Sequence, residues 1–306
     1  MKELVRSLLC AFFLSLALMP VAYGAKGYFV DLGGEDVSYD ATHGALVPVK
    51  AEREMAAIGL LLGTISPPVA SPQKPLIAIV IDDAGVDRSK SERAVRNLPA
   101  PVTLSYLAYA PHVQEQASEA AARGHEILLH LPWEADSEKA DPGPHHLSVN
   151  MSRKQLEENL LANLDGFKGY TGVNNHMGSR FSRYREGLEV VMAELRKRGV
   201  FFLDSVTTPD SSAEAVAREN GLAATHRDVF LDHVEKPEFV AAALRETGEI
   251  ARHTGSVVAI GHPKEMTLAA LEAWLPMMEA QGFQLVSMTT LMQYRQSVGA
   301  AHVAVK

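Results

Sequence analysis

Between residues 76 and 287, short apolar runs alternate with longer segments of helical periodicity. Apolar runs typical of buried strands occur at residues 76–82, 102–107, 126–130, 170–175, 200–204, 256–261 and 283–287. Segments with helical spacing lie between most of them, at residues 89–97, 112–123, 152–163, 185–198, 211–220, 238–253 and 267–281. Strands that alternate with helices in this way predict a mostly parallel sheet.

The number of strand–helix units narrows the fold further. About seven units with continuously apolar strands are many for a small open sheet, and they favour a closed or nearly closed barrel. Glycines that commonly end helices follow several helical segments: Gly124, Gly199, Gly221, Gly255 and Gly282. We therefore expect an α/β fold, a single-domain deformed (β/α) barrel of about seven parallel strands. A doubly wound open sheet is the alternative.

The first 24 residues have the layout of a signal peptide. Lys2 and Arg6 form a basic start, residues 8–18 are apolar, and Ala22 and Gly24 are small residues at the positions that a signal peptidase reads. We expect cleavage after Gly24 and a periplasmic or secreted protein without stable membrane insertion. An uncleaved N-terminal anchor is the alternative.

Composition excludes several classes of function. Cys10, within the predicted signal peptide, is the sole cysteine, so the processed chain would have no disulfide, thiolate metal site or cysteine nucleophile. The formal net charge of −8 without basic runs argues against nucleic acid and anionic membranes as partners. Residues 25–75 are expected to be a flexible segment and linker, residues 76–298 the barrel, and residues 299–306 a tail.

The run LIAIVIDDAG ends in two adjacent carboxylates, Asp82 and Asp83. Neighbouring like charges repel, and each ion costs free energy to desolvate. A bound metal ion or a shared proton would compensate for this cost. The sequence therefore predicts metal binding or acid–base chemistry at the end of the first apolar strand.

Further Asp and His residues end other predicted strands, and strand ends gather at the active face of a parallel barrel. Asp83, His130 and His176 would supply one oxygen and two nitrogen ligands to a divalent metal, and zinc is expected from imidazole and carboxylate ligands without thiolate. Asp82 would stay free to take a proton from water, and His262 would donate one. Asn175 and Asp204 end strands beside them.

The order of these motifs resembles the polysaccharide deacetylase family (carbohydrate esterase family 4), most closely its divergent bacterial branch. IAIVIDDAG, GHEILLH, FFLDS and AIGH are similar to four family motifs, and the resemblance covers residues 76–294. It implies Asp82 as base, Asp83 and His130 as metal ligands, and His262 as a catalytic histidine.

Two departures from the family pattern leave the third ligand open. Typical members have a second metal-binding histidine where this chain has Glu134, and an Arg-Pro-Pro-Tyr type motif where it has NNHMGSR. We interpret His176 as the replacement ligand, with Glu134 as its competitor. Arg227 either pairs with Asp228 or takes over the role of the absent arginine.

Four residues are candidates for substrate binding: Asn175, Asp204, Trp133 and Arg227. Trp133 could stack on a sugar ring or lie in the core. Asp232 and His233 are interpreted as a loop pair.

The resemblance implies an exported, metal-dependent hydrolase that removes acetyl groups from an N-acetylated or O-acetylated cell-envelope glycan. It would cleave carbon–nitrogen (amide) bonds in peptidoglycan or another N-acetylated polysaccharide. A non-catalytic glycan-binding or cell-envelope regulatory protein that keeps the barrel is the alternative. A glycosidase using Asp82 and Asp204 is a third hypothesis, which leaves His130 and His176 without a role.

Overall fold

The computed structural model describes residues 37–40, 45–48 and 74–304, with side chains described from residue 74 to 298. The predicted signal peptide and most of the predicted flexible segment lie outside this range. Strands β1 (Val37–Asp40) and β2 (Ala45–Pro48) pair in an antiparallel ribbon, which belongs to a compact unit separate from the rest.

A nine-stranded sheet forms the main unit, and all its described pairings are parallel. Its order is β8-β7-β6-β5-β4-β3-β10-β9, with β11 also paired to β3. The strands are β3 (Leu76–Ala84), β4 (Thr103–Leu107), β5 (Ile127–Trp133), β6 (Gly172–Met177), β7 (Phe201–Asp204), β8 (Ala224–His226), β9 (Val229–Phe230), β10 (Ser256–Gly261) and β11 (Gln284–Leu285). The predicted parallel (β/α) barrel is confirmed.

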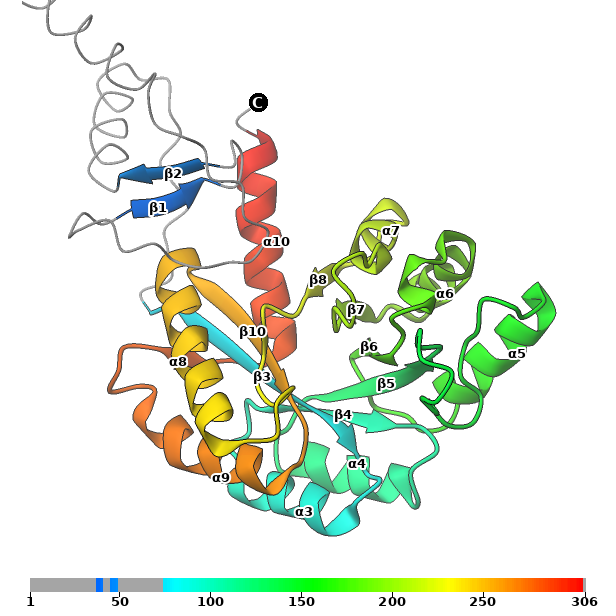
Figure 1. Ribbon diagram of the computed structural model, residues 1–306, viewed down its shortest axis with the longest axis horizontal. Coiled ribbons are helices and arrows are strands. Elements are labelled where there is room, and N and C mark those ends of the chain that lie inside the picture. The colour runs from blue at the N-terminus through cyan, green and yellow to red at the C-terminus, as the bar shows by residue number, and fades with distance from the viewer. Residues whose placement is uncertain (1–36, 41–44, 49–73, 305–306) are drawn as a thin grey trace, which may run out of the picture. The chain divides into compact units, whose positions relative to one another are not determined.

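The described α-helices accompany the strands (Figure 1). They are α3 (Arg88–Asn97), α4 (Val113–Ala122), α5 (Arg153–Leu164), α6 (Arg185–Arg198), α7 (Ala213–Glu219), α8 (Pro237–Thr254), α9 (Glu265–Trp274) and α10 (Met288–Ala304). Most lie outside the strands, whereas α10 contributes to the apolar cluster on the other face of the strands. Local signals set several ends: the Asp87 side chain caps α3, Ser152 and Gln155 form a capping box on α5, and left-handed Gly199 and Gly255 end α6 and α8. The segment predicted as helix 267–281 stops earlier, where Pro276 follows α9.

Strand β3 is apolar on both faces because both faces are covered. Ile77, Ile79 and Ile81 belong to the larger apolar cluster, which the outer helices share. Ala78 and Val80 belong to a second cluster with residues of β5, β7, β10 and α10. Side chains alternate between the two faces of a strand, so a continuous apolar run is what a barrel strand with two buried faces requires.

Strands β8 and β9 are the two edge strands of the sheet, and two residues, Arg227 and Asp228, connect them across the seam between these edges. Arg295 of α10 bridges this seam. Its guanidinium donates to Asp228 Oδ2 at 2.6 Å, to Thr225 Oγ1 at 2.8 Å and to Ser256 Oγ at 3.1 Å. Asp228 therefore pairs with Arg295. Among the described residues, the ion pair between Arg227 and Asp228 that was one of the alternatives does not form.

We expect Arg295→Met to lower the free energy of unfolding by about 2–3 kcal/mol, because the partly buried Asp228 would lose its charged partner. Both side chains are less than a fifth exposed, at 18% and 17%. Arg153→Met is the matched control: Arg153 is 77% exposed and pairs with Glu157 on its own helix, so its loss should cost about 0.5 kcal/mol or less. Equal changes in urea denaturation midpoints would contradict the bridging role.

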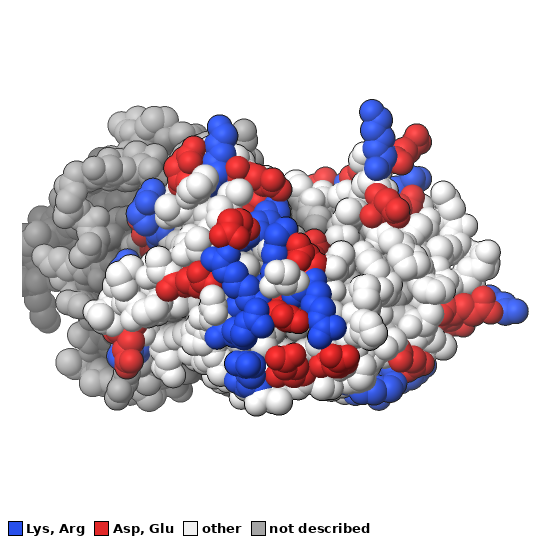
Figure 2. All heavy atoms as spheres, turned by 90° about the horizontal axis from the view of Figure 1, so that it is seen from below, with Lys and Arg blue, Asp and Glu red and all other residues white. Residues whose placement is uncertain are grey.

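Charged side chains of opposite sign alternate on the face seen from below (Figure 2). On α3, Arg93 pairs with Glu272 at 2.8 Å and Glu265 at 2.7 Å, and both partners belong to α9. Arg93 and Glu272 are each 26% exposed, and the two pairs join the neighbouring helices α3 and α9. Among the described residues, none of the helices combines the length and apolar character of a membrane span.

Candidate metal centre

A break in β3 turns both aspartates toward one cavity. In a regular strand, Asp82 and Asp83 would face opposite sides of the sheet. The register of β3 against β4 shifts between Ile81 and Ala84, and Asp83 has a left-handed backbone with φ of 55°. Such irregularities re-aim side chains, and here both carboxylates line the same cavity of about 250 Å³.

Asp83, His130 and His176 converge from three strands. Asp83 Oδ1 lies 2.9 Å from His176 Nδ1 and 3.3 Å from His130 Nε2, and these two nitrogens lie 3.2 Å apart. Burial alone would raise the pKa of Asp83, but the two imidazoles outweigh it and hold that pKa well below its usual range.

This donor set fits a divalent metal. The candidate ligand atoms all lie within 4.8 Å of one another, and Asp83 Oδ1 is buried without a well-aligned hydrogen bond. A buried oxygen and two converging ring nitrogens need a cation or proton between them. Carboxylate and imidazole are the ligands of hydrolytic zinc sites, which use three protein ligands.

Asn174 fixes the orientation of His130 and connects it to Asp82. Its Oδ1 lies 2.9 Å from His130 Nδ1, and its Nδ2 donates to Asp82 Oδ1 at 2.8 Å. The amide is fully buried and also contacts Ser105 and Ser205. With Nδ1–H donated to Asn174, the Nε2 lone pair of His130 faces the cluster, as metal-binding histidines require.

Asp82 lies beside the cluster. The residue is 3% exposed, and Oδ2 is 3.6 Å from His130 Nε2. Burial raises the pKa of Asp82, and the nearby His130 and His262 only partly offset this shift. A carboxylate whose pKa is raised by burial is suited to accept a proton during a reaction.

His262, the residue after β10, faces the cluster. Its Nδ1 lies 2.9 Å from Asp232 Oδ1, and its Nε2 lies 3.8 Å from Asp83 Oδ2. Asp232 is fully buried and also accepts from the His262 backbone N–H and from Thr267. Burial would lower the pKa of His262, but Asp232, with smaller contributions from Asp83 and Asp82, outweighs it and raises that pKa. The interpretation of Asp232 as a loop pair with His233 was therefore wrong.

Glu134 lies elsewhere. Its Oε2 accepts from Ser148 Oγ at 2.6 Å and Val149 N at 2.8 Å, and its Oε1 accepts from Arg180 at 2.9 Å. Oε2 thus holds the chain after β5 in place, and Oε1 holds the chain after β6. Glu134 is absent from the cavity lining, whereas His176 is part of it.

Two candidates for substrate binding, Asn175 and Arg227, line the cavity, and two do not. Trp133 is three residues after His130, so it faces the opposite side of β5 and packs fully buried against Phe181 and Phe202. Trp133 therefore has no exposed face on which a sugar could stack, and that part of the prediction was wrong.

Asp204 is also turned away from the cavity. Its Oδ1 accepts from Val206 N at 2.8 Å, and its Oδ2 accepts from Ser211 Oγ at 2.6 Å and Glu214 N at 3.4 Å. The carboxylate holds the turn after β7 and the start of α7. A substrate contact by Asp204 does not fit this arrangement.

Three of the five described non-glycine residues with positive φ lie in or next to the cavity lining. Besides Asp83, Met177 and Val206 are non-glycine residues with positive φ, at 53° and 48°. For a β-branched residue such as Val206 this conformation is unusual and costs about 1–3 kcal/mol. The turn persists because Asp204 and Arg227 bind its backbone on both sides.

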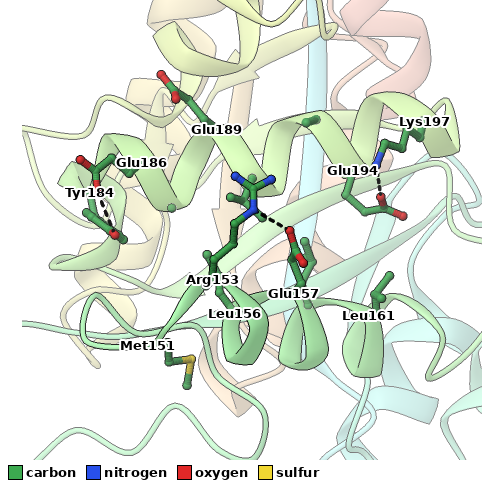
Figure 3. A pocket seen from close by; sticks show the side chains of 14 residues that line it. Met151, Arg153, Leu156, Glu157, Leu161, Tyr184, Glu186, Glu189, Glu194 and Lys197 are labelled. Carbon is green, nitrogen blue, oxygen red and sulfur yellow. Dashed lines mark hydrogen bonds and ion pairs between the residues drawn. The ribbon is translucent and has the colours of Figure 1, made fainter.

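A larger groove, of about 670 Å³, lies between α5 and α6 (Figure 3). Four of its charged residues pair with one another, Arg153 with Glu157 and Glu194 with Lys197. Within the described part of the chain, its lining contains no histidine. We therefore assign the chemistry to the smaller cavity, where carboxylates and imidazoles converge.

Fold and site together define a (β/α)-barrel protein with a candidate metal centre at the carboxyl ends of its strands. A family model described as "Divergent polysaccharide deacetylase" matches residues 79–292. The chain belongs to this family.

Its relatives include proteins without a characterised function. The chain is 33% identical over 220 residues to the uncharacterized protein YibQ of Escherichia coli (strain K12). The matched region is 72% of this chain and 67% of that protein. The chain is 32% identical over 216 residues to an uncharacterized protein of Haemophilus influenzae, covering 70% and 76%. A solved structure of an uncharacterized protein from Agrobacterium tumefaciens C58 matches with a TM-score of 0.70 at 29% identity, covering 73% of this chain and 92% of that one.

Proposed function

We propose that the protein is an exported, metal-dependent hydrolase that removes acetyl groups from a cell-envelope glycan such as peptidoglycan or another N-acetylated polysaccharide. The observation that carries the proposal is the convergence of Asp83, His130 and His176, with Asp82 and His262 beside them. Membership of the divergent polysaccharide deacetylase family supports the substrate class. The signal-like residues 1–24 support a periplasmic or secreted location.

In this proposal, Asp83, His130 and His176 hold the metal, and a zinc ion would supply Lewis-acid chemistry at the acyl carbonyl. Asp82 accepts the proton of the attacking water. His262 Nε2 donates a proton to the leaving nitrogen or oxygen, while Asp232 holds Nδ1 and fixes the ring orientation. Asn174 couples the base to a ligand by binding both Asp82 and His130.

The position of Asp204 argues against the glycosidase hypothesis, which needs Asp204 as its second carboxylate. Asp204 is 2% exposed, and both of its oxygens are hydrogen-bonded within the turn after β7. A two-carboxylate mechanism needs both groups beside the scissile bond.

The test is acetate release from N-acetylated glycan fragments by the protein purified with zinc. We expect release that stops when a chelator removes the metal and resumes when zinc is restored. Bound metal without acetate release from N- or O-acetylated fragments would contradict the deacetylase proposal and favour a glycan-binding or regulatory role. Metal analysis of the same sample separates that result from a failure to load the site.

A further inference from the structure

Arg227 is an arginine without a carboxylate partner in the candidate active site. Among the described residues that line the cavity, it is the one Lys or Arg side chain. Its Nε donates to Ser205 O and its Nη2 to Val206 O, both at 2.7 Å, and its guanidinium lies 4.9 Å from the centre of the Phe230 ring. These contacts lock the guanidinium plane against the turn after β7.

Most of the hydrogen-bonding capacity of Arg227 remains unused. A guanidinium carries five N–H donors, and two are taken by the backbone carbonyls. Within the described part of the chain, no Asp or Glu oxygen lies within 4.0 Å of it, whereas Arg93 and Arg295 each have close carboxylate partners. Burial lowers the pKa of Arg227, and the more distant carboxylates, that of Asp82 among them, do not offset this.

A partly buried cation that is held rigid and lacks a counterion is built to receive an anion. The free end of a guanidinium matches the two oxygens of a carboxylate in a planar, bidentate pair. The cavity, of about 250 Å³, must also admit the acyl group, which favours a small anionic substituent. Asp82 and Asp83 repel a carboxylate placed elsewhere in the cavity, so Arg227 also fixes its position.

We propose that Arg227 binds a carboxylate on the substrate, so that the preferred glycan is an acetylated sugar carrying an acidic substituent such as a lactyl ether or uronic acid group. This inference rests on the proposed glycan-acting function and specifies its substrate class.

The test compares two ligands that differ in charge and little in size: an N-acetylated amino sugar with a 3-O-lactyl carboxylate, and its carboxamide. On the zinc-loaded, unmodified protein, NMR titration should show the carboxylate binding about tenfold to a hundredfold more tightly. Arg227→Gln should abolish this preference, and Arg227→Lys should retain part of it. Arg245→Gln, an exposed position on α8, is the matched control and should leave it unchanged.

Equal affinities of the unmodified protein for the two ligands would overturn the proposal, and this comparison needs no variant that might misfold. The proposal would also be overturned if Arg227→Gln slowed the turnover of both ligands equally and kept the preference for the carboxylate. Arg227 would then act on the acyl group. The protein could also show an Arg227-dependent preference for the carboxylate and yet release no acetate. This result would support carboxylate recognition by Arg227 and reject the deacetylase activity.

Discussion

His176→Ala is expected to weaken metal binding by more than about a hundredfold, since even the loss of a residue that only orients a ligand costs about 10–100-fold. His176 Nδ1 lies 2.9 Å from Asp83 Oδ1 and 3.2 Å from His130 Nε2, so its removal opens one side of the cluster. Glu134→Ala should leave affinity unchanged, because both Glu134 oxygens are bound by Ser148, Val149 and Arg180. Metal content after dialysis against a graded chelator measures both variants.

Thermal unfolding of the two metal-free variants serves as the control, because Glu134→Ala removes hydrogen bonds from Ser148 and Val149 after β5 and from Arg180 after β6. If a folded Glu134→Ala protein lost the metal and His176→Ala kept it, the third metal ligand would be Glu134 and not His176. The metal would then have to bind outside the cavity described above.

Asp82→Asn is expected to lower the rate of acetate release by about 10²–10⁴-fold while the metal stays bound. The asparagine keeps the shape and can still accept a hydrogen bond from Asn174 Nδ2, but it cannot take a proton from water. His262→Ala should have a similar effect, because it removes the proposed proton donor, which Asp232 holds in place.

Asp83→Asn is the comparison for these two variants, and it should lose metal and activity together. The measurement is metal content and acetate release on the same preparations. Loss of metal from Asp82→Asn would show that Asp82 is itself a ligand, and full activity of His262→Ala would remove His262 from the reaction.

Most strands could be predicted because burial on both faces demands a continuous apolar run. Strands β8 and β9 could not, since three and two residues are too short to show any period. Helix α10 was also missed, because no further strand follows it to mark a repeating unit. Its Met288 and Leu291 nevertheless fill the cluster inside the barrel.

The convergence of the candidate ligands could be predicted because the carboxyl ends of parallel strands meet at one face. Their partners could not, because Asn174 acts on His130 through the β5–β6 register, which pairs these two residues directly. A signal for Asn174 did exist: it lies two residues before His176, and therefore on the same strand face. Trp133 and Asp204 were misplaced because position at a strand end does not say which face a side chain occupies.

The pairing of β3 with β10 also affects how the protein folds. Leu76 of β3 pairs with Ser256 of β10, 180 residues later in the chain. Contacts between such distant segments slow folding, because a long loop must close before they are made. The strand that carries Asp82 and Asp83 lacks one of its neighbours until residues 256–261 exist, and His262 follows directly after them. The candidate active centre is therefore assembled late, and a growing chain passes through most of its synthesis without it.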